Sequence, residues 1–415
     1  MDKNTLNKLI NMPGYVVEEI LEFTDTELHL LMRPKKRMPA ICSYCEQEHS
    51  KGYHSSDIVV AEDHPISGRR VFLHIKKRKY RCPEDGKIHV EKTPWLKLFS
   101  RITSRYAKQV SNLAAITTNT EAGWYLGLDD EVVYRIDKAY LENQAKEKLE
   151  PIPRAIHLSV DEVSYKKYHN YLTNVIDTDR KLIIWNQKGR KAEILDQYYT
   201  GIGKKNCEKI KSVAMDGART YISSTTKYAV NALIVYDKFH LVQKLNNTVD
   251  TVRKLELRKA RLEKDQELIN LMNCKKRFLL LKNKSRLTKY QSGYLDNLCK
   301  LNEPIYKAML LKESFLQVYS LANEDEATIS SYLADWMAEA YNSEIQPFVD
   351  LARKLADKIE YVLNWFKQKV SSAISEGFNN KIKRLKRMAY GYRDIDYFRL
   401  KIHQHCGLLN PRIAT

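Results

Sequence analysis

Glycine and proline are scarce in this sequence of 415 residues, which contains 14 and 11 of them. So small a share of chain-breaking residues excludes a low-complexity or disordered polymer, and 43% hydrophobic residues suffice to build buried cores. Long apolar runs are also missing, because the longest aliphatic stretch, Phe278 to Leu281, is far shorter than the roughly 20 residues of a membrane span. We therefore expect a soluble, folded chain with about two to four domains and no membrane contact.

Acidic residues are in deficit as well. The chain has 70 Lys and Arg against 51 Asp and Glu, which gives a formal net charge of +19. This balance favours polyanionic partners, and nucleic acid is the leading class. Only seven cysteines are present, and the first residues lack the charged-then-apolar pattern of a secretory signal. We expect a cytoplasmic protein whose cysteines are reduced thiols or metal ligands.

Residues 1–92 combine short strands with a stretch rich in cysteine and histidine. Val16–Phe23 and Glu27–Met32 have strand patterns, and two cysteines then follow with the two-residue gap of a zinc knuckle. We predict a structural Zn²⁺ in a small zinc-ribbon-like domain, since a closed four-ligand site leaves no open position for catalysis. The predicted ligands are Cys42, Cys45, Cys82 and His89. The alternatives for the fourth ligand are His49, His54 and Asp85.

Residues 93–150 have helical periodicity with one interruption. At the break, Gly127 suits a left-handed cap and Asp129 suits the N-cap of a following helix. This pattern predicts a helix-turn-helix DNA-binding domain, although a helical hairpin without a DNA role has the same pattern. The candidate phosphate contacts, on the basic strand before it and on its second helix, are Arg69, Arg70, Lys76, Lys77, Arg78, Lys79, Arg135 and Lys138.

Beyond Pro151 and Pro153 the pattern alternates between strands and helices. Three strands joined by tight turns are predicted at Ile156–Val163, Tyr168–Ile176 and Lys181–Asn186. A helix at 191–199, a strand at 211–215, a helix at 218–228 and a strand at 232–236 follow. This order predicts an α/β domain with a mixed five-stranded sheet, and the amphipathic segments after residue 241 predict a helical region.

Carboxylates stand at distinctive places in these elements. Asp161 lies in the first strand on the face opposite to its apolar residues, and Asp216 directly follows the fourth strand. Glu376 enters a strongly basic helix near the C-terminus. Single acidic residues at strand ends are often only turn formers. Three that converge can hold two divalent cations, which clamp the attacking and leaving oxygens in a phosphoryl displacement.

The runs around these residues resemble bacterial insertion-sequence DDE transposases, most closely the ISL-three group. The most specific are Asp237-Lys-Phe-His240 and the segment from Glu376 to Arg399. The resemblance covers nearly the whole chain. It implies a ribonuclease H-like catalytic core after the zinc-ribbon and helix-turn-helix domains. The implied parts are a first part at 151–261, an all-helical insertion at 262–365 and a C-terminal part at 366–415.

The resemblance also implies the chemistry. Asp161, Asp216 and Glu376 would be the catalytic triad and the ligands of two Mg²⁺ ions, which Mn²⁺ can replace, with Asp237 and His240 beside them. Asp237 is the alternative to Asp216 as the second ligand. The partners implied are the terminal inverted repeats and target DNA, and cutting two ends suggests a homodimer or larger assembly at the bacterial nucleoid. Phosphate contacts near the metals would be Lys381, Lys383, Arg384, Lys386, Arg387 and Arg393.

Two other functions fit parts of the pattern. A zinc and helix-turn-helix regulator with a vestigial nuclease-like body would bind specific DNA without cutting it. A structure-specific nuclease such as a junction resolvase would share the metal site but would not read a sequence.

Overall fold

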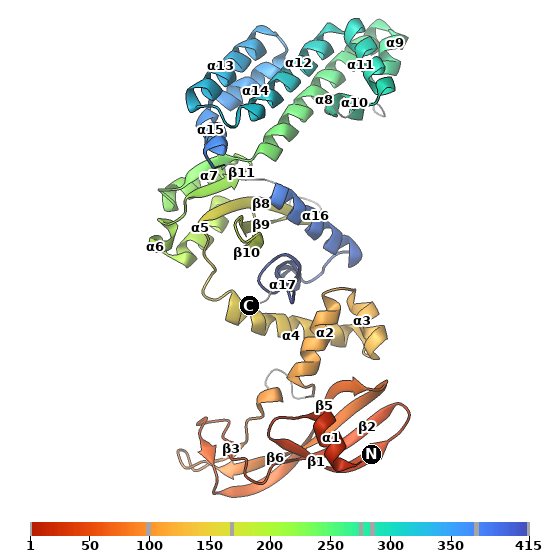
Figure 1. Cartoon of the computed structure of the whole chain (residues 1–415), viewed down its shortest axis with the longest axis vertical. Helices are drawn as coiled ribbons and strands as arrows, with labels where there is room; N and C mark the ends of the chain where they lie inside the picture. The colour runs from red at the N-terminus through yellow and green to blue at the C-terminus, as the bar shows by residue number, and fades with distance from the viewer. Residues whose placement is uncertain are drawn as a thin grey trace. The chain divides into compact units, whose positions relative to one another are not determined.

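The computed structural model divides the chain into two compact units. Unit 1 comprises residues 1–150 and 388–415, and unit 2 comprises residues 151–387 (Figure 1). Of the described residues, none belongs to a helix long and apolar enough to cross a membrane. The structure describes residues 2–96, 101–166, 170–273, 277–282, 287–368 and 373–412.

A five-stranded sheet forms the first part of unit 1. Its strands have the order β1-β2-β6-β5, and β7 pairs with β6. The long hairpin of β5 and β6 turns at Ser67 and Gly68, whose φ angles of 51° and 80° are those that a two-residue hairpin turn requires. The elements are α1 (Lys3–Ile10), β1 (Tyr15–Phe23), β2 (Glu27–Pro34), β3 (Ala40–Ile41), β4 (Glu48–His49), β5 (Tyr53–Ile66), β6 (Arg69–Arg81) and β7 (Ile88–Val90).

Helices α2 (Ser104–Ala114), α3 (Asn119–Leu126) and α4 (Asp130–Lys148) follow the short η1 (Pro94–Leu96). The predicted interruption at Gly127 is confirmed, because this residue ends α3 with φ 67° and Asp129 caps α4 through the backbone N–H of Glu131. A second break, between α2 and α3, was not predicted. It arises because Thr118 and Glu121 form a capping box that starts α3.

The C-terminal helix α17 (Ile395–Cys406) belongs to unit 1, whereas the prediction places residues 366–415 together in the catalytic core. The reason is a buried polar network around Asp137 of α4. Its carboxylate accepts hydrogen bonds from Tyr397 and Lys401 of α17, at 2.6 and 2.9 Å, and from Ser111 of α2 at 2.6 Å. These contacts bind α17 to the helices before it.

The sheet of unit 2 agrees with the predicted mixed five-stranded arrangement. Its strand order is β10-β9-β8-β11-β12, with β8, β9 and β10 antiparallel and β11 parallel to both β8 and β12. Tyr168, where the second strand was predicted to begin, lies outside the described residues. The strands are β8 (His157–Lys166), β9 (Asn170–Asp177), β10 (Leu182–Lys188), β11 (Ser212–Met215) and β12 (Leu233–Tyr236).

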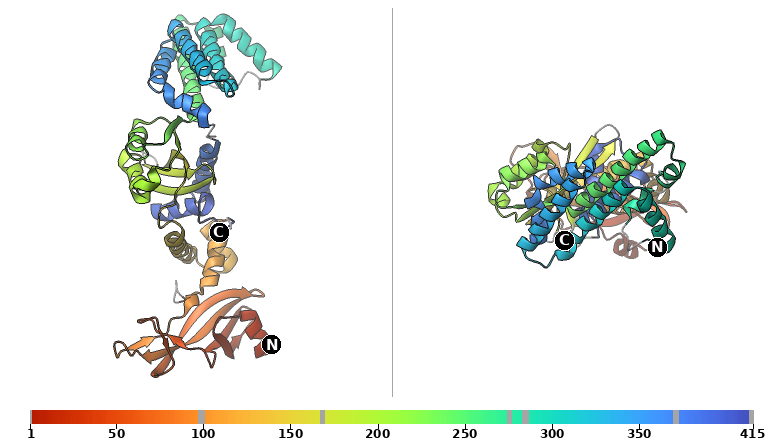
Figure 2. Two further views of the ribbon diagram at one scale, coloured as in Figure 1. Left: turned by 60° about the vertical axis from the view of Figure 1, so that its left-hand side comes forward. Right: turned by 90° about the horizontal axis from the view of Figure 1, so that it is seen from above.

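Helices cover both faces of this sheet (Figures 1 and 2). Leu158 and Val160 of β8 pack in one hydrophobic cluster with α5 (Ala192–Ile202) and α7 (Arg219–Tyr228), beside the short α6 (Lys204–Cys207). Because side chains alternate along a strand, Ser159 and Asp161 point to the opposite face. Helix α16 (Ala373–Met388) lies on that face.

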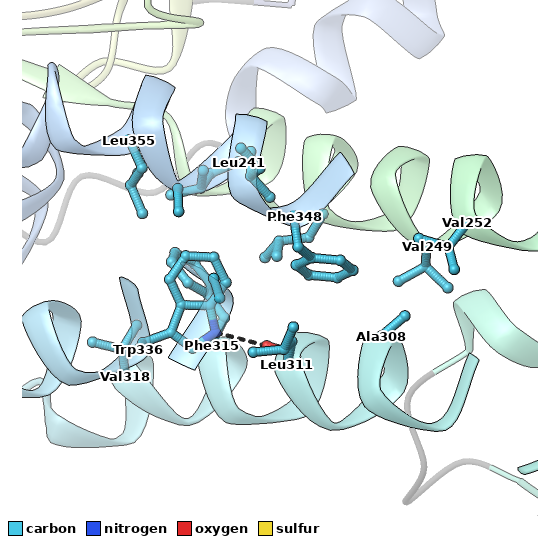
Figure 3. Packing of buried hydrophobic residues seen from close by; sticks show 14 of the residues in the cluster. Leu241, Val249, Val252, Ala308, Leu311, Phe315, Val318, Trp336, Phe348 and Leu355 are labelled. Carbon is cyan, nitrogen blue, oxygen red and sulfur yellow. Dashed lines mark hydrogen bonds between the residues drawn. The ribbon is translucent and has the colours of Figure 1, made fainter. Parts of the chain in front are cut away.

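A helical region continues directly from β12. It begins at Lys238 with α8, close to the start near residue 241 that the amphipathic pattern predicts, because Asp237 caps α8 at the end of the strand. Its core is apolar, and the buried Trp336 donates a hydrogen bond to the carbonyl of Leu311 at 2.8 Å (Figure 3). The helices are α8 (Lys238–Glu263), α9 (Gln266–Leu271), α10 (Arg277–Leu281), α11 (Lys289–Leu301), α12 (Glu303–Gln317), η4 (Val318–Leu321), α13 (Glu326–Asn342), α14 (Gln346–Ala356) and α15 (Ile359–Gln368).

The helical region returns to the sheet through α15. Asn364 is buried and donates a hydrogen bond to the carbonyl of Ile234 in β12, at 3.0 Å. Just before α15, Lys358 donates to the carbonyl of Gly217, in the loop after β11, at 2.5 Å. The insertion therefore leaves and rejoins the sheet at the carboxyl ends of β11 and β12.

Candidate metal centre and carboxylate site

Four side chains of unit 1 form a metal-binding constellation. They are Cys42, Cys45, His49 and Cys82, whose ligand atoms all lie within 4.8 Å of one another. The hairpin of β3 and β4 supplies the first three, and Cys82 directly follows β6. Three thiols and an imidazole are a donor set that Zn²⁺ takes in closed tetrahedral sites. The residues therefore fit the predicted structural zinc.

The turns that carry the cysteines are shaped for this role. Gln47 accepts a hydrogen bond from the backbone N–H of Cys42, and Lys87 accepts one from that of Cys82, so each thiol stands at the base of a tight turn. Burial acts to raise the pKa of Cys42, but backbone N–H groups of Cys45 and Tyr44 lower it, and the net pKa is lowered. Burial raises the pKa of the neighbouring Cys45 to about 11, so in the absence of metal the negative charge of this thiol group is favoured on Cys42.

The prediction of His89 as the fourth ligand is corrected, because His49 occupies that place. The imidazole of His89 pairs instead with Asp85 at 2.8 Å and stacks on the ring of Tyr44, with centroids 4.9 Å apart. His54, another alternative, is exposed and contacts the hydroxyl of Ser55.

We expect His49→Ala to weaken zinc binding by about 100-fold or more, because a direct ligand contributes at least as much as an outer-shell partner. His89→Ala is the matched control and should change the affinity little. Competition with a chromophoric chelator measures both affinities in the full chain. Equal losses in the two variants would contradict the assignment.

The strand register of unit 2 brings carboxylates to one level of the sheet. Ala214 of β11 pairs with Ser159 of β8, so Asp216 and Asp161 each stand two residues beyond a paired position. In the same way Met215 of β11 pairs with Tyr236 of β12, and Asp216 and Asp237 each follow directly. Three neighbouring strands therefore carry an aspartate at a common level.

His240, in the first turn of α8, lies among these aspartates. Its Nε2 is 3.6 Å from Oδ1 of Asp161 and 4.0 Å from Oδ2 of Asp237. Burial acts to lower the pKa of His240, whereas Asp161 and the charges of Asp237 and Asp216 raise it, and the net pKa is raised. The histidine therefore partly balances a concentration of negative charge.

Helix α16 lies along β8 and brings Glu376 to the same region. The hydroxyls of Ser375 and Ser159 are 2.7 Å apart, and Asn379 donates a hydrogen bond to Oδ2 of Asp161 at 2.7 Å. Residues three apart on a helix are neighbours on its surface. Glu376 is exposed and stands next to Ser375, three residues before Asn379, so it belongs to the helical turn that covers Asp161.

The three predicted ligands share this region without forming a close cluster. Among the described residues, three or more ligand atoms lie within 4.8 Å of one another in the cysteine and histidine group of unit 1 and not at these carboxylates. The oxygens of Asp161 accept from Asn379 and from the backbone N–H of Glu162, and Asp216 accepts from that of Ala218. Sequence reasoning missed Asn379; its signal was an amide one helical turn beyond Glu376.

Comparison with known proteins shows the family to which this chain belongs. The family model DDE_Tnp_ISL3, described as "Transposase", matches residues 158–402, more than half of the chain. The chain belongs to this family. A second model, a zinc finger of the transposases of IS204, IS1001, IS1096 and IS1165, matches residues 38–85 of this ISL3-family chain. That match includes all four residues of the cysteine and histidine group.

Curated relatives agree with the family assignment. The ISL3-family chain is 29% identical over 415 residues to the transposase for insertion sequence element IS1001 of Bordetella parapertussis, covering 97% of this chain and 98% of the relative. It is 25% identical over 346 residues to the transposase for IS1557 of Mycobacterium tuberculosis, covering 78% and 76%. Both alignments are longer than the stretch of residues 158–402 that the transposase family model matches.

The basic residues predicted on β6 of this ISL3-family chain have internal partners. Five of the six form ion pairs, and burial lowers the pKa of the remaining one, Lys77. These cations are already compensated within the sheet, so phosphate binding there would have to break existing pairs. The pairs are Arg69 with Asp25 (3.5 Å), Arg70 with Glu62 (2.9 Å), Lys76 with Glu18 (2.5 Å), Arg78 with Glu91 (2.7 Å) and Lys79 with Asp57 (2.6 Å).

The basic residues of α16 differ in this respect. Within the described part of the chain, no carboxylate lies within 4.0 Å of any of their charged groups. Lys381 lies over the ring of Phe378, and Lys386 contacts the carbonyl of Ser164 in β8 at 3.4 Å. These uncompensated cations are Lys381, Lys383, Arg384, Lys386 and Arg387.

Lys138 of α4 also has an internal partner, whereas the neighbouring Arg135 is exposed. The ammonium group of Lys138 lies 2.7 Å from Oδ2 of Asp394, which also accepts from the hydroxyl of Tyr134 at 2.7 Å. Burial acts to raise the pKa of Asp394, but these two donors outweigh it and lower the pKa to about 2. The pair joins α4 to the N-terminus of α17.

Because the folded pKa of Asp394 is below its ordinary 3.8, this pair stabilises unit 1 above about pH 4 and is lost as the pH falls toward 2. We expect a contribution of about 1–2 kcal/mol, reduced by partial exposure. Asp394→Asn should remove the loss of stability that occurs as the pH falls from about 4 toward 2. Hydrogen exchange of residues 130–148, measured as a function of pH, detects this change. The exposed Asp396→Asn is the control, and an identical acid profile in both variants would exclude this role.

Proposed function

We propose that this chain is a DDE transposase that binds the terminal inverted repeats of an insertion sequence. In this proposal it hydrolyses the phosphodiesters at the element ends with two divalent metal ions and joins the 3′-hydroxyls to target DNA. The contact of Asn379 with Asp161 carries the proposal, because it sets the helix of Glu376 against the strand of Asp161. The meander extended by two crossover strands supports a ribonuclease H-like assignment for the sheet.

The proposed metal ligands have suitable chemistry. Asp161, Asp216 and Glu376 offer carboxylate oxygens, which Mg²⁺ and Mn²⁺ prefer, and carboxylates of Asp161 and Asp237 within 4.0 Å of Nε2 of His240 support a negatively charged site there. Asp161 would contact both ions, and Asp216 and Glu376 one each. When bound, two such ions activate the attacking hydroxyl and stabilise the leaving oxygen.

The surrounding residues would position these ligands and the DNA. Asn379 donates to Oδ2 of Asp161, while Oδ1 accepts from the backbone N–H of Glu162 and lies 3.6 Å from Nε2 of His240. Asp237 is 3% exposed and caps α8 through the N–H of Phe239, which favours a positioning role for it over direct metal binding. The free cations of α16 are suited to the phosphates beside the scissile bond.

Unit 1 would supply the sequence-reading part. The helices α3 and α4 with their three-residue turn support a helix-turn-helix role, with the exposed Arg135 as a phosphate contact and Arg393 as another. Since an element has two ends, we propose a homodimer or larger assembly on DNA, acting at the bacterial nucleoid. Zinc would hold the turns of Cys42 and Cys82 together.

Cleavage assays with the purified full chain test this proposal. We expect nicking at the ends of terminal inverted repeats with Mg²⁺ or Mn²⁺, and none after chelation of these ions. Sequence-specific binding without cleavage would favour the regulator, and preference for a four-way junction over the repeats would favour a structure-specific nuclease. Either result would overturn the transposase mechanism.

A further inference from the structure

Three basic side chains gather at the loop that follows β11. They come from segments far apart in the chain: Arg219 begins α7, Lys244 lies in α8, and Lys358 precedes α15. Lys244 donates a hydrogen bond to the carbonyl of Asp216 at 3.1 Å, and Lys358 donates to that of Gly217 at 2.5 Å. Both lysines therefore stabilise the conformation of the backbone at Asp216, a proposed metal ligand.

The loop is built closely around these lysines. The ring of Tyr236 lies 4.9 Å from the Nζ of Lys244 and 5.9 Å from that of Lys358. Gly217 has φ 78°, and a Cβ there would come within 2.9 Å of the Tyr236 ring and 3.4 Å of the Lys358 ammonium. A side chain at this position would therefore force the loop and the cations apart.

The charge of this group is not balanced by carboxylates. In the described ranges of the chain, no carboxylate oxygen lies within 4.0 Å of the charged atoms of Arg219, Lys244 or Lys358. Desolvation lowers the pKa of Lys358, and the positive charges of Lys244 and Arg219 lower it further, against the opposing charges of Asp216 and Asp357. The ammonium groups of Lys244 and Lys358, which bond adjacent carbonyls, and the guanidinium of Arg219, whose charge acts on Lys358, are stabilised when an anion binds among them.

We propose that Arg219, Lys244 and Lys358 form a phosphate-binding subsite for a DNA strand that passes Asp216. This inference rests on the proposed transposase function. The subsite is separate from the cations of α16, because it lies at the end of β11, whereas α16 lies on β8. Helix α7 begins at the same loop without a side-chain cap, so its first N–H groups add to the positive potential.

The salt dependence of DNA binding tests the subsite. In the full chain, the logarithm of affinity falls with the logarithm of salt concentration by about 0.9 for each phosphate contacted. We expect the triple variant R219Q/K244Q/K358Q to reduce this slope by about 1–2 and to reduce cleavage of pre-bound DNA. Lys211→Gln, an exposed lysine at the opposite end of β11, is the matched control and should leave the slope unchanged.

A second variant separates binding from folding. Arg219 is exposed, and its side chain forms no hydrogen bond with the backbone of the described residues, so Arg219→Gln alone should reduce the slope by up to about 1 without loss of structure. An unchanged slope in both variants, with hydrogen exchange of the Gly217 loop as in the wild type, would overturn the subsite. If the wild type fails to cleave while the slopes still fall, the subsite stands and the transposase mechanism fails.

Discussion

Replacing Asp161 by asparagine should reduce DNA cleavage by about 10³-fold or more while DNA binding persists. The substitution keeps the size of the side chain but removes the charge that would hold both metal ions, and a preorganised electrostatic group of this kind typically contributes 10²–10³-fold or more. Cleavage of labelled terminal-repeat DNA in Mg²⁺ measures the loss, and a gel-shift titration at fixed salt measures binding.

The matched control for this prediction is Asp179→Asn. Asp179 is exposed in the turn between β9 and β10 of the same sheet, away from the ends of β11 and β12. The Asp179→Asn variant should cleave terminal-repeat DNA at the rate of the wild type. If Asp161→Asn cleaved at a comparable rate, the carboxylate site would have no catalytic role, and binding alone would remain as the function of the chain.

The same assay decides between the two candidates for the second ligand. We expect Asp216→Asn to abolish cleavage, whereas Asp237→Asn should retain much of it, because asparagine can still cap α8. The reverse order of effects would assign the ligand to Asp237. Mn²⁺ binding measured by calorimetry gives an independent reading of the same comparison.

Much of unit 2 could be predicted from the sequence, because its strands are apolar and buried and the turns between them contain typical turn residues. The strands near Ile156–Val163 and 232–236 are confirmed within a few residues. Strand β5 was missed because only Ala61 and Asp63 of its fourteen residues are buried, so no apolar alternation marks it. Helix α1 has only eight residues, too few for a clear period.

The sites were harder to predict because their partners are distant in the sequence. The choice between His49 and His89 depends on the pairing of β3 with β4, which spacing alone cannot decide. Similarly, the charge run of β6 does not reveal the carboxylates that pair with its cations, such as Asp57 on the neighbouring β5 and Glu18 on β1. The cations of α16 differ, because among the described residues no carboxylate lies within 4.0 Å of them.

Breaking the buried network around Asp137 should destabilise unit 1 by about 3–5 kcal/mol, the largest stability effect that we expect. Asp137 is fully buried and pairs with Lys401, which is 3% exposed. Burial lowers the pKa of Lys401, although the charge of Asp137 opposes this. Removing the carboxylate in Asp137→Ala therefore leaves the buried ammonium group of Lys401 without its counter-ion and takes an acceptor from the hydroxyls of Ser111 and Tyr397.

The double variant D137N/K401M distinguishes this explanation from a simple loss of packing. Asparagine can accept a hydrogen bond from one of the hydroxyls of Ser111 and Tyr397 and donate its amide N–H to the other, and methionine fills the volume of the lysine stem without its charge. The double variant should therefore be more stable than Asp137→Ala, with Lys146→Met on the exposed face of α4 as a control within about 0.5 kcal/mol. Hydrogen exchange of residues 104–148 and 395–406 during urea unfolding reports unit 1 separately from unit 2. If the double variant were as unstable as Asp137→Ala, the shape of the site would matter more than its charge pair.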